Sequence, residues 1–449
     1  MKRFLPLLVC CLFLTPRPAH SFCGFYVAAG NAKLYNHASQ VVLARDGDRT
    51  VITMASDFKG EPRDFALVIP VPTVIVKEQV HVGDIRLVQH IDAYSAPRLV
   101  EYFDPPPCMA QISRAMDAAR PAAGAMKMMA REEMSTNAVH IEARFTVGEY
   151  DILVLSASQS GALLAWLRDN GYRVPPAAAP VVGAYLKQGM KFFVAKVNLK
   201  EQQRLGFVSL RPIQVAYETP KFMLPIRLGM ANADGPQDLL IYTLTRTGRV
   251  ECTNYRTVKL PTDVDVPEFV QARFADFYRD LFDRQCGKEG LGVVFTEYGW
   301  DMGWCDPCAS QPLSPAEQQA LGAFWLDDAG NGRTPQGQSY CTRLHVRYDA
   351  AHFPEDLVFQ QTPDRTNWQA RYVMHRPWRG SLDCPGGDAY RAELRERRQR
   401  EAQNLADLTG WSAADIKRQM AVAADWSLPS ESATWYQRLW RSVDSTGVR

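Results

Sequence analysis

Several common catalytic motifs are absent from the sequence. It contains no H-E-x-x-H zinc helix, no G-x-S-x-G nucleophile turn and no phosphate-binding loop. The nearest approach to such a loop, Gly287-Lys288-Glu289, lacks the hydroxyl residue that should follow the lysine. No pair of carboxylates stands out as a hydrolase dyad. If the protein is a hydrolase, its site is therefore assembled from dispersed residues.

A charge excess of either sign is also missing. The 449 residues include 51 Lys and Arg against 49 Asp and Glu, so the formal net charge is +2. A balanced charge gives no general attraction to nucleic acid or to an anionic surface, and we expect no nucleic-acid partner. The composition, 46% hydrophobic and 22% charged, is that of a globular protein.

Long apolar runs are absent beyond the N-terminus. Basic residues at 2–3 precede an apolar run at 4–14, which is shorter than the roughly 20 residues needed to span a bilayer. A polar stretch with small residues then ends at Ser21. This pattern predicts a signal peptide over 1–21, cleaved between Ser21 and Phe22. We therefore expect an exported protein with no stable membrane span after cleavage; an uncleaved anchor is the alternative.

The cysteine count fits an exported chain. Of ten cysteines, Cys10 and Cys11 would leave with the signal peptide. Eight remain: Cys23, Cys108, Cys252, Cys286, Cys305, Cys308, Cys341 and Cys384. An even number in an oxidising compartment predicts disulfides, although sequence does not fix their connectivity. Closure of local loops favours the pairs Cys23–Cys108, Cys252–Cys286, Cys305–Cys308 and Cys341–Cys384.

The stretch from Trp304 to Cys308, W-C-D-P-C, is similar to the active-site pattern of thioredoxin. A reactive thiol in that pattern lies at a helix N-terminus, which lowers its pKa. Here the next helix is predicted to begin at Ser314, where Ser314 and Glu317 form a capping box. We therefore expect Cys305 and Cys308 to be a structural pair. A redox pair is the main alternative, and a zinc site lacks a second pair of ligands.

Other side chains that could bind a ligand or metal are interpreted mainly as structural. His345 and His352 are spaced in a way that does not place both on one helical face, so we expect no metal site. Tyr298, Trp300 and Trp304 lie among glycines. They either pack in the core around a disulfide or stack on a sugar or peptide. No cofactor is expected.

Strand patterns dominate the first two thirds of the chain. Two β-branched runs at 40–58 flank Asp46-Gly47-Asp48, a hairpin signal. Residues 139–157 alternate as a half-buried strand does, and further strands are expected at 207–217, 222–229, 238–245 and 249–260. Short connections favour antiparallel pairing. The sequence predicts an α+β fold with mostly antiparallel β-sheets and packed helices.

Two prolines mark one strand as unusual. The run at 64–76 carries Pro70 and Pro72, which lack N–H groups on the same side of an extended strand. Such a strand is expected at a sheet edge, with the proline side unpaired. Protection against aggregation explains this feature, and a docking edge is the alternative.

Helical patterns account for the remaining predicted elements. They are expected at 84–103 in part, at 158–172 and at 267–284; a charged helix at 388–408 should present a solvated face with i,i+4 ion pairs. The predicted organisation, in order, is signal peptide 1–21, body 22–386 and helical tail 387–449. Within the body lie an Ala/Met-rich insert at 113–137 and a Cys-rich section at 286–384.

A set of ordered segments carries a family resemblance: FCGFYVA at 22–28, FALVIPVP, GEYDILVLSA, ALLAWLRDNGYRVP, GMKFFVAKVNL, PKFMLPIRLGM and the CDPC pair. Over roughly 22–345 the chain resembles an exported bacterial family known as domain of unknown function 2330. The resemblance implies a periplasmic or secreted location. It implies no reaction, cofactor or catalytic residue.

The resulting expectation is an exported envelope protein with structural disulfides. It would act without catalysis, by binding or scaffolding another envelope protein through an exposed sheet edge. The alternatives are a thiol–disulfide oxidoreductase using Cys305 and Cys308, and an envelope hydrolase with a dispersed site.

Overall fold

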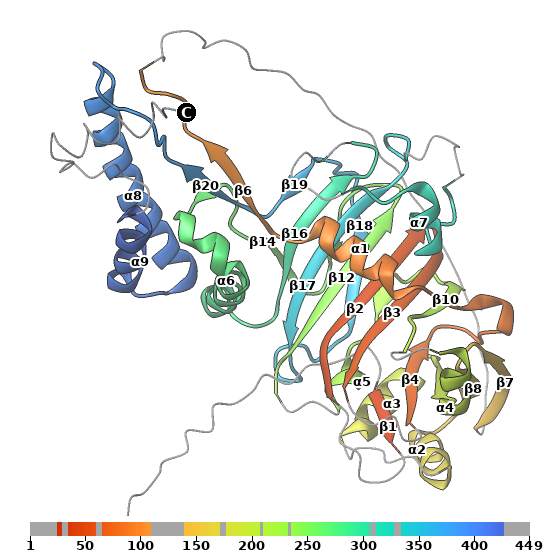
Figure 1. Ribbon diagram of the computed structural model, residues 1–449. Coiled ribbons are helices and arrows are strands. Elements are labelled where there is room, and N and C mark those ends of the chain that lie inside the picture. Colours follow the sequence, from red (N-terminus) through yellow and green to blue (C-terminus); the bar gives the residue numbers. More distant parts are fainter. Residues whose placement is uncertain are drawn as a thin grey trace, which may run out of the picture.

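The structure is a computed structural model, shown in Figure 1. It describes residues 25–28, 35–59, 65–108, 139–170, 177–206, 210–231, 235–304, 306, 311–326 and 334–425. The predicted signal peptide with its cleavage site, the Ala/Met-rich insert, and Cys23, Cys305 and Cys308 lie outside the described residues.

A large mixed sheet forms the centre of the molecule (Figure 1). Its strands, in spatial order, are β14 (Arg256–Lys259), β16 (Val293–Asp301), β17 (Tyr340–Tyr348), β12 (Gln237–Thr245), β2 (Tyr35–Asp46), β3 (Arg49–Lys59), β10 (Ile213–Glu218) and β5 (Val80–Val82), with β19 (Trp368–Gln369) also paired to β16. The predicted hairpin is confirmed as β2 and β3. Gly47 has φ +57° in its turn, a value that glycine adopts readily.

A second sheet packs against the first. It is antiparallel throughout, in the order β1 (Phe25–Ala28), β4 (Phe65–Val71), β9 (Lys191–Val197), β8 (Tyr150–Ser156) and β7 (His140–Val147). Side chains from both sheets, such as Val41 and Ile52 from the first and Leu67 and Ile152 from the second, share one buried core. Burial of this shared apolar surface holds the two sheets face to face.

The proline-bearing strand is not an edge strand along its whole length. Strand β4 lies between β1 and β9, and the described residues of β1 pair with Phe65 to Val68. Pro70 pairs with β9, opposite Phe192. The prediction of an edge strand is therefore wrong at Phe65 to Val68, where β4 has a strand on each side.

Helices cover the outer faces of both sheets. Helices α1 (Ile85–Ser95) and α7 (Pro315–Ala320) lie on the large sheet, and α2 (Ser160–Asp169) and α3 (Ala178–Lys187) lie on the second. The capping box at Ser314 is confirmed, since its hydroxyl accepts from the N–H of Glu317 and α7 begins at the next residue. Short helices α4 (Leu199–Leu205) and α5 (Arg227–Met230) and the 3₁₀ turn η1 (Lys77–Gln79) connect strands.

A third region lies at the β16 side of the large sheet (Figure 1). It contains the parallel strands β15 (Val264–Asp265), β20 (Arg371–Arg376) and β6 (Arg98–Phe103) with the 3₁₀ helix η2 (Glu268–Arg273), α6 (Phe274–Glu289), α8 (Gly387–Thr409) and α9 (Ala413–Asp425). A small antiparallel sheet, β11 (Met223–Leu224), β18 (Leu357–Gln361) and β13 (Val250–Cys252), completes the fold. The α+β class with a helical C-terminal region is confirmed, and several ladders are parallel.

The charged helix α8 differs from the expectation in one respect. Arg397 and Glu401 form the predicted i,i+4 pair, with 3.5 Å between Nε and Oε1, but both side chains are buried. They face the third region, where Arg397 also reaches Asp104. The prediction of a solvated face is therefore wrong at these residues. The helix uses part of its charge to attach to the body.

Candidate functional site

One disulfide joins distant parts of the described chain. Cys108, just after β6, pairs with Cys384, just before α8, across 276 residues. The predicted pairs Cys23–Cys108 and Cys341–Cys384 are therefore wrong. They followed from local loop closure, whereas the structure brings together segments that are far apart in the sequence.

Three further cysteines, predicted to form disulfides, are free and buried. Cys252 lies in the core between the two sheets, Cys286 on α6 lies in the helical region, and Cys341 lies beneath α1 and α7. Because they occupy separate cores, the predicted Cys252–Cys286 bridge is also wrong. Burial raises the pKa of Cys286 and of Cys341 to about 12, so these thiols stay protonated and unreactive at neutral pH.

The described part of the CDPC stretch is firmly attached to the core. Asp306, between the two cysteines, is buried. The Tyr298 hydroxyl donates to its Oδ2 at 3.1 Å, and the Arg98 guanidinium lies 3.4 Å from the same oxygen. Whether Cys305 and Cys308 form a redox pair or a structural one stays a prediction.

A buried network of charges lies on the large sheet beneath α6 and α1. Its centre is Glu297 on β16, whose side chain is 0% exposed. Arg343 on β17 donates to Glu297 Oε2 at 2.6 Å, and His345 Nδ1 lies 2.9 Å from Oε1. The hydroxyl of Tyr278, on α6, donates to the same Oε1. The register of β16 shifts between Thr296 and Tyr298, so Glu297 is the bulged residue.

The network continues toward the surface at both ends. Arg343 also donates to Asp92 Oδ1 on α1 at 2.6 Å. In the other direction His345 Nε2 lies 3.7 Å from Asp238 Oδ1, which accepts from Arg347 at 2.8 Å. The ring of Phe282 stacks on His345 at 3.6 Å and closes this side. The network thus ties α1, α6 and three strands together.

The charged side chains of this network shift one another's pKa values. Burial alone would raise the pKa of Glu297, but the charges of His345 and Arg343 outweigh it and lower the pKa to about 2. Burial alone would lower the pKa of His345, but Glu297 and Asp238 outweigh it and raise that pKa. His345 therefore lies between two carboxylates that favour its protonated form. Because each named charge already has partners and Glu297 is closed to solvent, the network is built to position elements of the fold.

A second feature is an open groove beside the disulfide. It encloses about 600 Å³ and is lined by Glu101, Phe103, Asp104, Arg376, Pro377, Trp378, Arg379 and Gly380. Its wall is largely aromatic and apolar. Phe103 is 74% exposed and the neighbouring Tyr102 is 47% exposed, which is unusual for large apolar side chains.

The walls of the groove are held rigidly. They consist of the end of β6 and the segment after β20. The Cys108–Cys384 disulfide links these two segments a short distance beyond the groove. The hydroxyl of Tyr390, on α8, accepts from the N–H of Trp378 and donates to Asp104. A Cβ at Gly380 would lie 2.4 Å from the Trp378 ring, so the glycine lets the indole pack on the backbone.

Strand β6 has an open edge next to this groove. Within the described residues it pairs only with β20, in parallel. The N–H of Arg98 donates to the carbonyl of Ala370, just before β20, and the N–H of Asp104 donates to the carbonyl of Arg376 at its end. By strand alternation, the N–H and C=O groups of Glu101 and Phe103 point away from β20. The edge therefore offers backbone donors and acceptors beside an aromatic groove.

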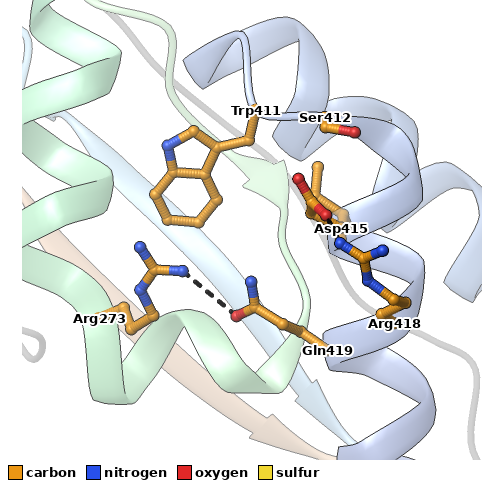
Figure 2. A pocket seen from close by; sticks show the side chains of 7 residues that line it. Arg273, Trp411, Ser412, Asp415, Arg418 and Gln419 are labelled. Carbon is orange, nitrogen blue, oxygen red and sulfur yellow. Dashed lines mark hydrogen bonds and ion pairs between the residues drawn. The ribbon is translucent and has the colours of Figure 1, made fainter. Parts of the chain in front are cut away.

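A third feature is a pocket between α9 and η2 (Figure 2). It encloses about 390 Å³ and is lined by Arg273, Trp411, Ser412, Asp415, Ile416, Arg418 and Gln419. Arg273 lies over the Trp411 ring at 4.5 Å and donates to Gln419 Oε1 at 3.3 Å. The Trp411 indole N–H donates to Asp280 at 2.7 Å. These contacts attach the tail to the body.

Sequence reasoning missed most of these features. His345 was considered only together with His352, although Arg343, His345 and Arg347 recur at every second residue of one strand, a signal that these charges share one face. His352 lies elsewhere, where its ring contacts Asp349. In the described part of the chain, no group of three or more His, Cys, Asp or Glu residues is arranged to hold a metal ion.

Comparison with known proteins places the chain in a family. Among the residues that the structure describes, no helix has the length and apolar composition needed to cross a membrane. No curated protein and no solved structure gives a significant match. A family model for an uncharacterized protein conserved in bacteria matches residues 17–360. The chain therefore belongs to the bacterial family known as domain of unknown function 2330.

Proposed function

We propose that this protein is exported to the bacterial cell envelope and binds an extended segment of another envelope protein, without catalysing a reaction. The segment would add as a strand to the open edge of β6 and place its side chains in the groove of Phe103, Pro377 and Trp378. This mode uses backbone hydrogen bonds for affinity and the groove for selectivity.

The observation that carries the proposal is the open edge of β6 beside exposed aromatic side chains. Among the described residues the outer edge of β6 is unpaired, and it ends in Tyr102 and Phe103, which are 47% and 74% exposed. Proteins normally cover or charge such an edge. Here the edge adjoins a groove whose walls end at the Cys108–Cys384 disulfide. A rigid groove loses little entropy on binding, which favours recognition.

Two further observations support export and binding over the alternatives. A disulfide persists in an oxidising compartment, which agrees with the predicted signal peptide. The most concentrated set of carboxylate and imidazole groups is centred on Glu297, which is closed to solvent, and a hydrolase needs such groups to face its substrate.

The test isolates a single backbone donor. The purified, oxidised protein is applied to an array of overlapping peptides tiled from exported proteins of the same organism, and peptides that bind are measured in solution. Glu101→Pro removes an N–H that points away from β20 and leaves the ladder to β20 intact. We expect binding about tenfold weaker, a change of about 1.4 kcal/mol.

Glu101→Ala is the matched control. It also removes the ion pair with Arg376 but keeps the outward N–H. We expect it to bind within a few-fold of the wild type. Equal binding by all three proteins, or the absence of any peptide that binds, would contradict the proposal.

A further inference from the structure

A separate cavity surrounds Trp304 at the end of strand β16. It encloses about 540 Å³, within the range of about 300–1,000 Å³ typical of small-ligand sites. Its lining residues come from the turn after β16, the turn before β17 and the segment before β19: Asp301, Trp304, Gln336, Gly337, Arg365 and Asn367. Three turns that are distant in the sequence therefore converge on one opening.

Trp304 presents an aromatic ring at this opening. Of the three aromatics that the sequence placed here, Tyr298 is fully buried and Trp300 packs on it, with 5.9 Å between ring centroids. Trp304 is 52% exposed. The core interpretation thus accounts for the first two residues and leaves Trp304 unexplained.

The floor of the cavity is built rigidly around Asp301. Its carboxylate accepts from the N–H of Gly303 at 2.9 Å and from the N–H of Gly337 at 3.1 Å. A Cβ at Gly303 would lie 2.4 Å from the Cα of Gln336, so only glycine allows the two turns to touch. The ring of Trp304 is therefore carried on a fixed support.

The charges of the cavity cancel. Arg365 donates to Asp301 Oδ2 from two nitrogens, at 2.9 and 3.3 Å, and also donates to backbone carbonyls. Two neutral amides are left for a ligand. The Gln336 side chain and the Nδ2 group of Asn367 make no hydrogen bond with the part of the chain that the structure describes, while Asn367 Oδ1 accepts from the Asp301 N–H.

An exposed indole, two amides and no unpaired charge match the chemistry of a neutral sugar. The C–H face of a pyranose ring stacks on an aromatic side chain, and its hydroxyls both donate to and accept from amides. We propose that this cavity binds a neutral oligosaccharide, with one pyranose ring on Trp304 and its hydroxyls on Gln336 and Asn367. The proposal does not depend on peptide binding at β6.

Calorimetric titration of the mature, oxidised protein tests the proposal. The probes are maltohexaose and hexa-N-acetylchitohexaose, both neutral, and oligogalacturonate, which is acidic. We expect saturable binding of at least one neutral probe in the micromolar to millimolar range and weaker binding of the acidic one. Trp304→Ala should weaken neutral binding by about tenfold or more, Trp304→Phe by less, and Gln336→Ala by a few-fold.

The control variant is Phe324→Ala, which removes another exposed aromatic outside the cavity and should bind like the wild type. Unchanged circular dichroism and thermal midpoint confirm that each variant is folded. The proposal fails if neither neutral probe saturates, if Trp304→Ala binds within about twofold of the wild type, or if the acidic probe binds more tightly.

Discussion

Arg343 offers the sharpest test of what holds this fold together. Its side chain is 4% exposed and bridges Asp92 on α1 and Glu297 on β16, with donor–acceptor distances of 2.6 Å to each. The guanidinium also lies over the Tyr242 ring at 5.3 Å. Arg343→Met keeps much of the side-chain volume and removes the charge.

The expected cost follows from what the substitution leaves behind. Asp92 is partly exposed and can be hydrated, whereas Glu297 is 0% exposed and keeps only His345 and Tyr278 as partners. Removing one member of a buried ion pair costs about 3–5 kcal/mol. That is a large share of the roughly 5–15 kcal/mol that stabilises a typical domain. We expect Arg343→Met to lower the free energy of unfolding by about 3 kcal/mol or more.

Urea unfolding, followed by circular dichroism and with the disulfide intact, measures the effect. Arg49→Met is the matched control, since Arg49 pairs with Glu218 on the same sheet at 2.9 Å but the two side chains are 68% and 71% exposed. An exposed pair contributes about 0–1 kcal/mol. Adding Glu297→Gln to Arg343→Met should recover part of the loss, because it removes the unpaired buried charge. Similar midpoints for the two methionine variants would refute the reasoning.

Two other predictions concern the disulfide and the tail. Mass spectrometry of unreduced protein should find Cys108 linked to Cys384. Cys384→Ala should lower the free energy of unfolding by about 2–5 kcal/mol. Alkylation of the three buried free cysteines in native protein would contradict their assignment as inaccessible thiols. Burial raises the pKa of Glu401 to about 7, against 4.5 for the free group, even though the Arg397 charge opposes the shift. The raised pKa gives stability that is present below pH 4.5 and is lost as pH rises through about 7. Backbone amides of α8 should therefore exchange more slowly in Glu401→Gln than in the wild type at pH 8. At pH 4.5 the two proteins should exchange at similar rates. The same difference in protection at both pH values would contradict the prediction.

Local sequence signals predicted much of the secondary structure. Asp46-Gly47 predicted the turn between β2 and β3, and the Ser314–Glu317 capping box predicted the start of α7. These signals succeeded because the interactions that set a turn or a helix start join residues only a few positions apart. The prediction of an edge position for the proline-bearing strand was wrong at Phe65 to Val68, because no local signal shows that β1 pairs there.

The candidate sites were much less predictable. The β6 groove combines residues near 101–108 with residues near 376–384, and no local pattern shows that these segments meet. For the Trp304 cavity, the sequence indicated only a loop of aromatic residues that either pack in the core or stack on a sugar or peptide. Its neutral charge depends on Arg365, which approaches Asp301 from a distant segment.

By itself the sequence determined the periodicity of the strands, the main helices and the family, because those depend on neighbouring side chains and on the order of segments. Only the tertiary structure decided which cysteines pair, which charges are buried and which aromatics remain exposed. These properties depend on distances between residues far apart in the chain. Cys108 is nearer to Cys23 in sequence, yet the fold places its sulfur beside Cys384.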